Sequence, residues 1–200
     1  MATFTEPDIR YVLTEYRTLA ELCDGRPQTA AEVRALIAGG RLPRPTYVLP
    51  SGEERFPPDY FALLDDAGGV DELPARFRVR YLATADGPFA AADADEDWAG
   101  YLSGQFGVCL RSVTPESMAA KNRLVRRIEA LVAAPAEADP AWRGELRTTV
   151  DALDALERPF TDFDRQRWGD TSRIRHIDRV RARFPAAFEE AHASAITATS

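Results

Sequence analysis

The segment that most constrains the fold is residues 39–60, GGRLPRPTYVLPSGEERFPPDY, in which helix-ending glycines precede two short strand-like runs. Gly39 and Gly40 follow a helical pattern of apolar residues and can supply the left-handed conformation that often closes a helix. The runs YVL and RF then lie on either side of Ser51 and Gly52, and prolines border both runs. This pattern predicts a small β-hairpin held between two helices.

The rest of the chain carries the spacing and the cap residues of helices. Thr5 can cap a helix that runs to Cys23, and Thr29 with Glu32 forms a capping box for the next helix. The pairs Thr114-Pro115 and Asp139-Pro140 open two long helices whose apolar residues recur at helical spacing. The acidic, turn-rich interval ATADGPFAAADADED is expected to be a linker or a long loop. The predicted fold is therefore mainly α with one hairpin.

Residues 18–64, TLAELCDGRPQTAAEVRALIAGGRLPRPTYVLPSGEERFPPDYFALL, resemble the winged helix-turn-helix of the excisionase and MerR-like families. The matching pieces are a helix, a turn, a second helix and the wing, which correspond to Leu19–Cys23, Gly25–Gln28, Thr29–Ala38 and Tyr47–Phe56. The resemblance implies a winged-helix-like module at residues 1–69, packed on a helical domain at residues 70–200.

The charge of this segment argues against DNA as a partner. Residues 1–66 hold seven arginines and eleven acidic residues, a net charge of −4. The helix in the reading position offers only Arg34 for contact with base edges, and the wing tip sets Glu53 and Glu54 against Arg55. A helix-turn-helix used as a scaffold fits this composition better than one that reads DNA.

A second resemblance spans nearly the whole chain and rests on four stretches. These are LPRPTYVLPSGEE with PPDYFALLDDAGG, then YLSGQFGVCLRSVTPE, LERPFTDFDR and SRIRHIDRVRARFP. They resemble an uncharacterised actinobacterial family, domain of unknown function 6058, whose members are labelled natural-product biosynthesis proteins. That label implies a setting in specialised metabolism and no reaction.

Composition and motif content limit which cellular compartment and which cofactors we expect for this protein. The net charge is −7, and no apolar run approaches the roughly 20 residues of a membrane helix. The N-terminus, MATFTEPDIRYVL, has no secretory pattern, so we expect a cytoplasmic protein. Two cysteines outside any CxxC motif, with only His176 and His192, predict neither a disulfide framework nor a dedicated transition-metal site. We expect no cofactor.

Two residues are candidates for catalysis. His176 could act as a general acid or base with Asp162 or Asp178, although a surface or interface histidine is the alternative. Cys109, in GQFGVCLRS, has Arg111 two residues on, which could activate a thiolate, but its apolar neighbours equally suit a buried core cysteine. No nucleophile elbow, phosphate loop or dinucleotide fingerprint is present in the sequence, so whether the protein is an enzyme stays open.

The C-terminal arginines suggest a binding site. Residues 158–200 hold eight arginines and six acidic residues, so their net charge is +2, opposite in sign to the −7 of the whole chain. Guanidinium groups suit a carboxylate or a phosphate, so Arg158, Arg165 and Arg173, with Trp168, are candidates for substrate binding. The alternative is pairing of these arginines with nearby aspartates, which are Asp162, Asp164, Asp170 and Asp178. We expect an accessory or tailoring protein that binds an anionic small molecule or a carrier-protein-bound intermediate. The alternative function is a DNA-binding regulator of its gene cluster.

Overall fold

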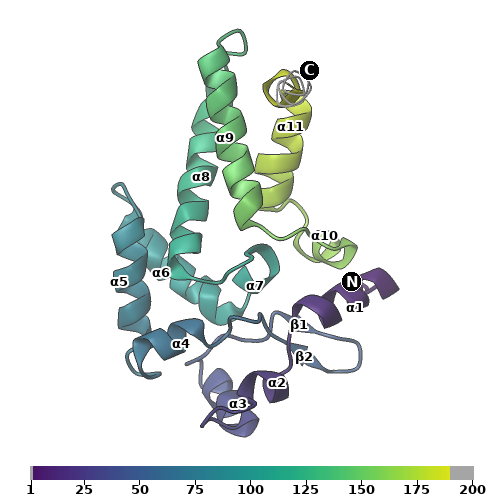
Figure 1. Ribbon diagram of the computed structural model, residues 1–200, viewed down its shortest axis with the longest axis vertical. Coiled ribbons are helices and arrows are strands. Elements are labelled where there is room, and N and C mark those ends of the chain that lie inside the picture. Colours follow the sequence, from purple (N-terminus) through teal and green to yellow (C-terminus); the bar gives the residue numbers. More distant parts are fainter. Residues whose placement is uncertain (1, 190–200) are drawn as a thin grey trace, which may run out of the picture. The chain divides into compact units, whose positions relative to one another are not determined.

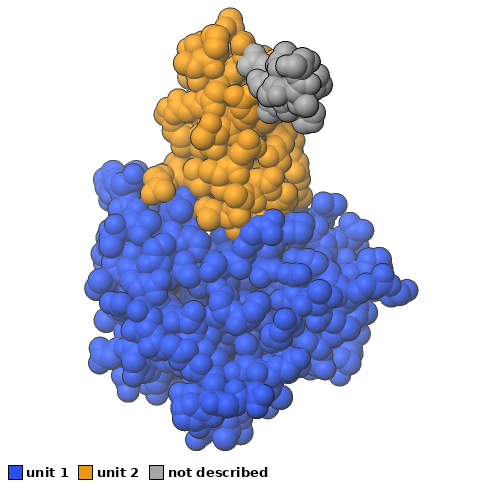
Figure 2. Space-filling model, in the orientation of Figure 1, with its two compact units in different colours: residues 1–120, 158–169 blue, residues 121–157, 170–200 orange. Residues whose placement is uncertain are grey.

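The computed structural model describes residues 2–189, and within this range the chain is mainly helical with a single two-stranded antiparallel hairpin (Figure 1). The predicted fold class is confirmed. The chain divides into two compact units, coloured separately in Figure 2. Unit 1 comprises Met1–Ala120 and Arg158–Gly169, and unit 2 comprises Lys121–Glu157 and Asp170–Ser200.

The elements follow one another along the chain with short connections. Those before residue 110 are α1 (Glu6–Glu15), α2 (Leu19–Cys23), α3 (Ala30–Ala38), β1 (Tyr47–Val48), β2 (Glu54–Arg55), α4 (Ala62–Ala67), α5 (Leu73–Thr84), α6 (Ala90–Ser103) and α7 (Phe106–Cys109). Those after it are α8 (Pro115–Ala133), α9 (Pro140–Leu156), α10 (Asp162–Trp168), the π-helix η1 (Ile174–Asp178) and α11 (Arg179–Arg183). Within residues 2–189 no helix is long and apolar enough to cross a membrane.

The first predicted helix is interrupted, contrary to the expectation that it would run to Cys23. Helix α1 ends at Glu15, and Arg17 exchanges two backbone hydrogen bonds with Phe56, at 2.9 and 2.8 Å. The chain is therefore extended at the point where it borders the hairpin. Thr18 then starts α2 with a capping box of its own, in which its side chain accepts from the backbone N–H of Glu21.

The hairpin forms where the sequence predicted it. Tyr47 lies opposite Arg55, and Val48 lies opposite Glu54. Gly52, with a φ of 83°, makes the tight turn between them. Helices α2 and α3 precede β1 and β2 along the chain. The aromatic rings of Tyr47 and Phe56 are fully buried, so the hairpin packs on the core of unit 1.

Residues 100–110 pack closely on the segment that leads into the hairpin. The backbone N–H of Arg44 donates to the carbonyl of Leu102 at 2.9 Å, and the Thr46 hydroxyl donates to the carbonyl of Gly104 at 3.3 Å. A methyl group on Gly104 would overlap the carbonyl oxygen of Arg44, and one on Gly107 would overlap the Thr46 hydroxyl. This close approach explains why unit 1 extends past residue 69, where a module boundary was expected, and reaches Ala120.

The acidic interval at residues 83–97 is mostly helix, and its prediction as a linker or a long loop was wrong. Helix α6 begins at Ala90 and buries Ala94, Asp97 and Tyr101, which are three or four residues apart on one face. The buried carboxylate of Asp97 accepts a hydrogen bond of 2.8 Å from the hydroxyl of Tyr81 on α5. One aspartate of this acidic run therefore faces the core, where the Tyr81 hydroxyl supplies its hydrogen bond.

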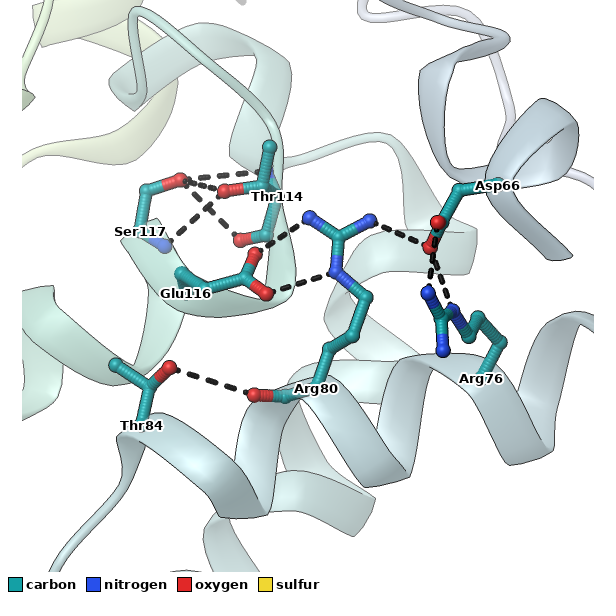
Figure 3. Close-up of polar contacts among 7 residues, drawn as sticks. All are labelled: Asp66, Arg76, Arg80, Thr84, Thr114, Glu116 and Ser117. Carbon is teal, nitrogen blue, oxygen red and sulfur yellow. Dashed lines mark hydrogen bonds and ion pairs between the residues drawn. The ribbon is translucent and has the colours of Figure 1, made fainter.

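An ion-pair network connects α4, α5 and the start of α8 (Figure 3). Arg80 donates from Nε and Nη2 to the two carboxylate oxygens of Glu116, both at 2.7 Å, and from Nη1 to Asp66 at 2.9 Å. Arg76 adds a second fork to Asp66, at 2.6 and 2.8 Å. These hydrogen bonds, that of Arg76 first, hold the pKa of Asp66 far below its ordinary value. The network joins α4 and α5 to the first turn of α8, within unit 1.

Unit 2 has its own apolar core between α8, α9, η1 and α11. Helices α8 and α9 run side by side, joined by a short loop (Figure 1), and the indole N–H of Trp142 donates to the carbonyl of Leu131 at 3.2 Å. In η1 the backbone N–H of Arg179 donates to Ile174, five residues earlier, which marks a π-helical turn. Such turns often occur at functional sites, and this one contains His176.

Candidate functional site

His176 is buried in unit 2, between two hydrogen-bond acceptors. Its Nδ1 lies 3.1 Å from the carbonyl oxygen of Ser172, and its Nε2 lies 3.0 Å from a carboxylate oxygen of Glu129 on α8. Both contacts can be hydrogen bonds at once only if both ring nitrogens carry a proton, because a carbonyl and a carboxylate are acceptors. Both ring nitrogens therefore face oxygen atoms of the protein. The partner is Glu129, not the Asp162 or Asp178 that the sequence suggested.

A chain of polar contacts, largely shielded from solvent, supports His176 through the carbonyl of Ser172. The Ser172 hydroxyl donates to Glu157 at 2.7 Å, and the ammonium group of Lys121 lies 3.1 Å from the same carboxylate oxygen. Glu157 has no exposed surface, and Lys121 is nearly buried. The Lys121–Glu157 pair thereby holds Ser172 in place, and the Ser172 carbonyl orients the His176 ring. No sequence pattern points to Lys121, Glu157 or Ser172, apart from the rarity of lysine in this chain.

His176 lines a surface hollow of about 370 Å³. Its floor is apolar, and it carries basic side chains and one carboxylate; the lining residues are Ile128, Glu129, Val132, Ala133, Arg175, His176, Val180 and Arg183. Arg175 and Arg183 are exposed, and in the part of the chain that the structure describes neither is paired with a carboxylate. The Arg183 guanidinium lies 4.8 Å from the centre of the adjacent Phe184 ring. We call this cavity the basic hollow.

Two of the predicted substrate-binding arginines lie in unit 1, and each has an intramolecular partner. Arg158 is buried and donates to the carbonyl of Leu110 at 3.0 Å and to Glu15 at 2.9 Å. Arg165 lies 3.5 Å from Asp162, one of the aspartates that the sequence offered as an alternative partner. Pairing inside the protein therefore accounts for the contacts of both side chains.

The third predicted arginine, Arg173, lies in unit 2 and contacts Asp154 at 2.7 Å. Burial alone would raise the pKa of Asp154, but hydrogen bonds from Arg181 and Arg173 outweigh it and lower that pKa. Trp168, in unit 1, is 41% exposed and lies against Arg167, whose guanidinium is 4.8 Å from its ring. The predicted binding residues are thus divided between the two units. Only Arg173 shares a unit with His176.

Asp164, another aspartate in the predicted cluster, is fully buried and contacts the hairpin. It accepts hydrogen bonds from the hydroxyls of Tyr47 at 3.0 Å and of Thr161 at 2.7 Å. Burial raises the pKa of Asp164 above the ordinary value, although these hydrogen bonds oppose that rise. This contact places α10, and with it Arg165 and Trp168, in unit 1.

Cys109 lies in the other unit from His176, at the end of α7. Its side chain is buried, with the sulfur 3.7 Å from the carbonyl oxygen of Phe106. The two candidate catalytic residues thus belong to separate units. Among residues 2–189 no group of three or more His, Cys, Asp or Glu side chains is placed to hold a metal ion. His192 lies outside the described residues.

The arginines of the proposed reading helix and wing have intramolecular partners as well. Arg34 lies 3.3 Å from Glu54 at the hairpin. Arg55 is buried, pairs with Glu53 and donates to the carbonyl of Tyr16 at 3.3 Å. These contacts occupy the two cations that a DNA-reading winged helix would need here.

Comparison with the curated proteins and with the solved structures gave no match. One family model matches residues 72–185, more than half of the chain. This range includes every residue that lines the basic hollow, together with Lys121, Glu157 and Ser172, and it excludes the hairpin and the helices before it. The matching model is described as a family of unknown function, DUF6058, and the chain belongs to this family.

Proposed function

We propose that this protein is an accessory or tailoring protein of bacterial specialised metabolism that binds an anionic small molecule, free or tethered to a carrier protein, in the basic hollow. The observation that carries the proposal is the position of Arg175 and Arg183 beside an apolar floor and the Nε2 atom of His176. Neither arginine has a carboxylate partner among residues 2–189. The volume of about 370 Å³ falls within the usual range of small-molecule sites.

The distribution of ion pairs supports this choice of site. Arg158, Arg165 and Arg173 form ion pairs with Glu15, Asp162 and Asp154, respectively. An anion that approached them would have to break those pairs. At Arg175 and Arg183 a ligand breaks no carboxylate ion pair within residues 2–189, so it gains their charge-assisted hydrogen bonds without that cost. The specialised-metabolism setting comes from the sequence resemblance alone.

His176 supports binding more than base catalysis. Both ring nitrogens already contact protein oxygens, so neither is free to take a proton from a substrate while both contacts hold. When the Glu129 contact opens, Nε2 can donate a hydrogen bond to an anionic ligand.

The alternative role as a DNA-binding regulator draws support from the order of α2, α3 and the hairpin. The paired state of Arg34 and Arg55 weighs against it. We expect no sequence-specific binding to fragments of the protein's own gene cluster at low salt. A footprint lost in Arg34→Ala would favour the regulator.

The proposal is tested in two steps. Deletion of the gene should lead to an accumulated intermediate with the neighbouring genes still transcribed, whereas loss of their transcripts would favour the regulator. The accumulated compound is then titrated into the protein by calorimetry. Arg175→Ala and Arg183→Ala should each weaken its binding about two- to tenfold, since solvent screens exposed charges.

Arg127→Ala is the matched control, because Arg127 is an exposed arginine of unit 2 that pairs with Glu145 and does not line the hollow. Its affinity should equal that of the parent protein. Equal affinities for all three variants and the parent would show that the hollow is not the binding site.

A further inference from the structure

We infer that the ligand of the basic hollow is a carboxylate with an apolar chain, and that it binds by taking the place of Glu129 on His176. This inference rests on the function proposed above and narrows it to one chemical class. It follows from the contact that His176 already makes, from the position of the hollow on α8 and from the floor of the hollow.

The Nε2 atom of His176 is covered by a carboxylate of the protein itself. Only 8% of the His176 side chain is exposed, and the Glu129 oxygen lies 3.0 Å from Nε2, whereas Glu129 is 58% exposed. A ligand anion can therefore reach Nε2 only at the position that the Glu129 carboxylate occupies. Glu129 can swing into solvent at low cost, because an ion pair with such an exposed partner changes an equilibrium constant only about two- to fivefold.

The surrounding backbone favours a monoanion over a phosphate dianion. Ile128, Glu129, Val132 and Ala133 form the last turns of α8, which ends at Ala133. The carbonyl groups at a helix C-terminus carry partial negative charge, which repels a dianion more strongly than a carboxylate. The hollow thus already holds one carboxylate, that of Glu129, against Nε2 of His176, and the helix end disfavours a second negative charge at the same position.

The apolar floor of the hollow favours a ligand whose carboxylate is attached to an apolar chain. Ile128, Val132 and Val180 supply branched apolar side chains beside the basic groups. Each methylene group that a ligand buries there would strengthen binding about fourfold. An acyl chain attached to the carboxylate therefore completes the fit, and a short carboxylate such as acetate would use only the charged rim.

The test compares three probes on the full chain by calorimetry: octanoate, acetate and octyl phosphate. Octanoate should bind at least tenfold more tightly than acetate, and more tightly than octyl phosphate. Glu129→Gln should tighten octanoate binding about two- to fivefold, because the competing carboxylate is gone. Glu145→Gln, which removes the same charge from an exposed pair on α9, should leave the affinity unchanged.

The outcomes separate this inference from the function on which it rests. Tighter binding of octyl phosphate, or an octanoate affinity that is unchanged or weaker in Glu129→Gln, would overturn the inference while the hollow remains an anion site. If no probe binds in an Arg175- and Arg183-dependent way, the inference fails, and the proposed function is decided by the titration of the accumulated intermediate. Equal tightening in Glu129→Gln and Glu145→Gln would also contradict displacement, because it would reflect only net charge.

Discussion

Lys121 is the only lysine in a chain of 200 residues, and its ammonium group lies against a carboxylate with no exposed surface. A buried carboxylate is costly unless it is paired and hydrogen-bonded, and Glu157 has both Lys121 and the Ser172 hydroxyl on the same oxygen. The turn at Ser172 presents a carbonyl to His176. The contacts of this buried pair therefore help to orient the His176 ring in the basic hollow.

Replacing one partner of this pair should cost more than replacing both. In Lys121→Met the carboxylate of Glu157 stays buried without its cation, and we expect a loss of about 3–5 kcal/mol in the free energy of unfolding. The double variant Lys121→Met, Glu157→Gln should regain much of that loss, because it buries no charge. Urea denaturation measures both. A double variant whose loss equals the sum of the single losses would show that the two side chains are not coupled.

The sequence predicted His176 as a site residue but could not identify its partner, because Glu129 lies 47 positions away on another helix. It also predicted that the C-terminal arginines gather, and the structure divides them according to which aspartate or glutamate each one meets. Arg158 meets Glu15, which is 143 positions away. Pairings of this kind depend on tertiary packing, and local charge counts do not report them.

Among the elements, capping residues predicted helix starts well, and composition predicted loops poorly. Thr5 caps α1 as predicted, and Thr29 caps α3 through the capping box that the sequence shows. The break at Tyr16–Arg17 escaped prediction, because the backbone pairing of Arg17 with Phe56 competes there with continued helix. Helix α6 was missed because its alanines and aspartates look like a solvated loop. The position of Asp97 opposite Tyr81 is a property of the fold.

Two glycines in helical surroundings should respond oppositely to alanine. Gly104 has a φ of 80° and packs against the Arg44 carbonyl, so Gly104→Ala should destabilise the protein by about 2 kcal/mol or more. Gly144, within α9, has open space around it, so Gly144→Ala should stabilise by about 0.5–1 kcal/mol. Thermal or urea unfolding measures both changes. A neutral Gly104→Ala would contradict the close packing of residues 100–110 on the segment before the hairpin.

For the molecule as a whole, the mainly helical fold with one hairpin follows from the sequence, whereas its division into units does not. Periodicity and glycine-proline punctuation are local signals, so they predict elements. The units are set by contacts such as Arg44 with Leu102 and Tyr47 with Asp164, which join distant parts of the chain. The family match to residues 72–185 begins after the hairpin and includes the whole basic hollow. The residues proposed to bind the ligand thus lie in the part that defines the family.

The central claim is that a carboxylate with an apolar chain binds in the basic hollow, and NMR chemical-shift mapping of the full chain with octanoate tests it most directly. The claim predicts saturable shifts at Val132, Arg175, His176, Val180 and Arg183, which are lost together in the Arg175→Ala, Arg183→Ala double variant. Shifts confined to residues around Arg158, Arg165 and Trp168, or no saturable shift up to millimolar octanoate, would contradict it.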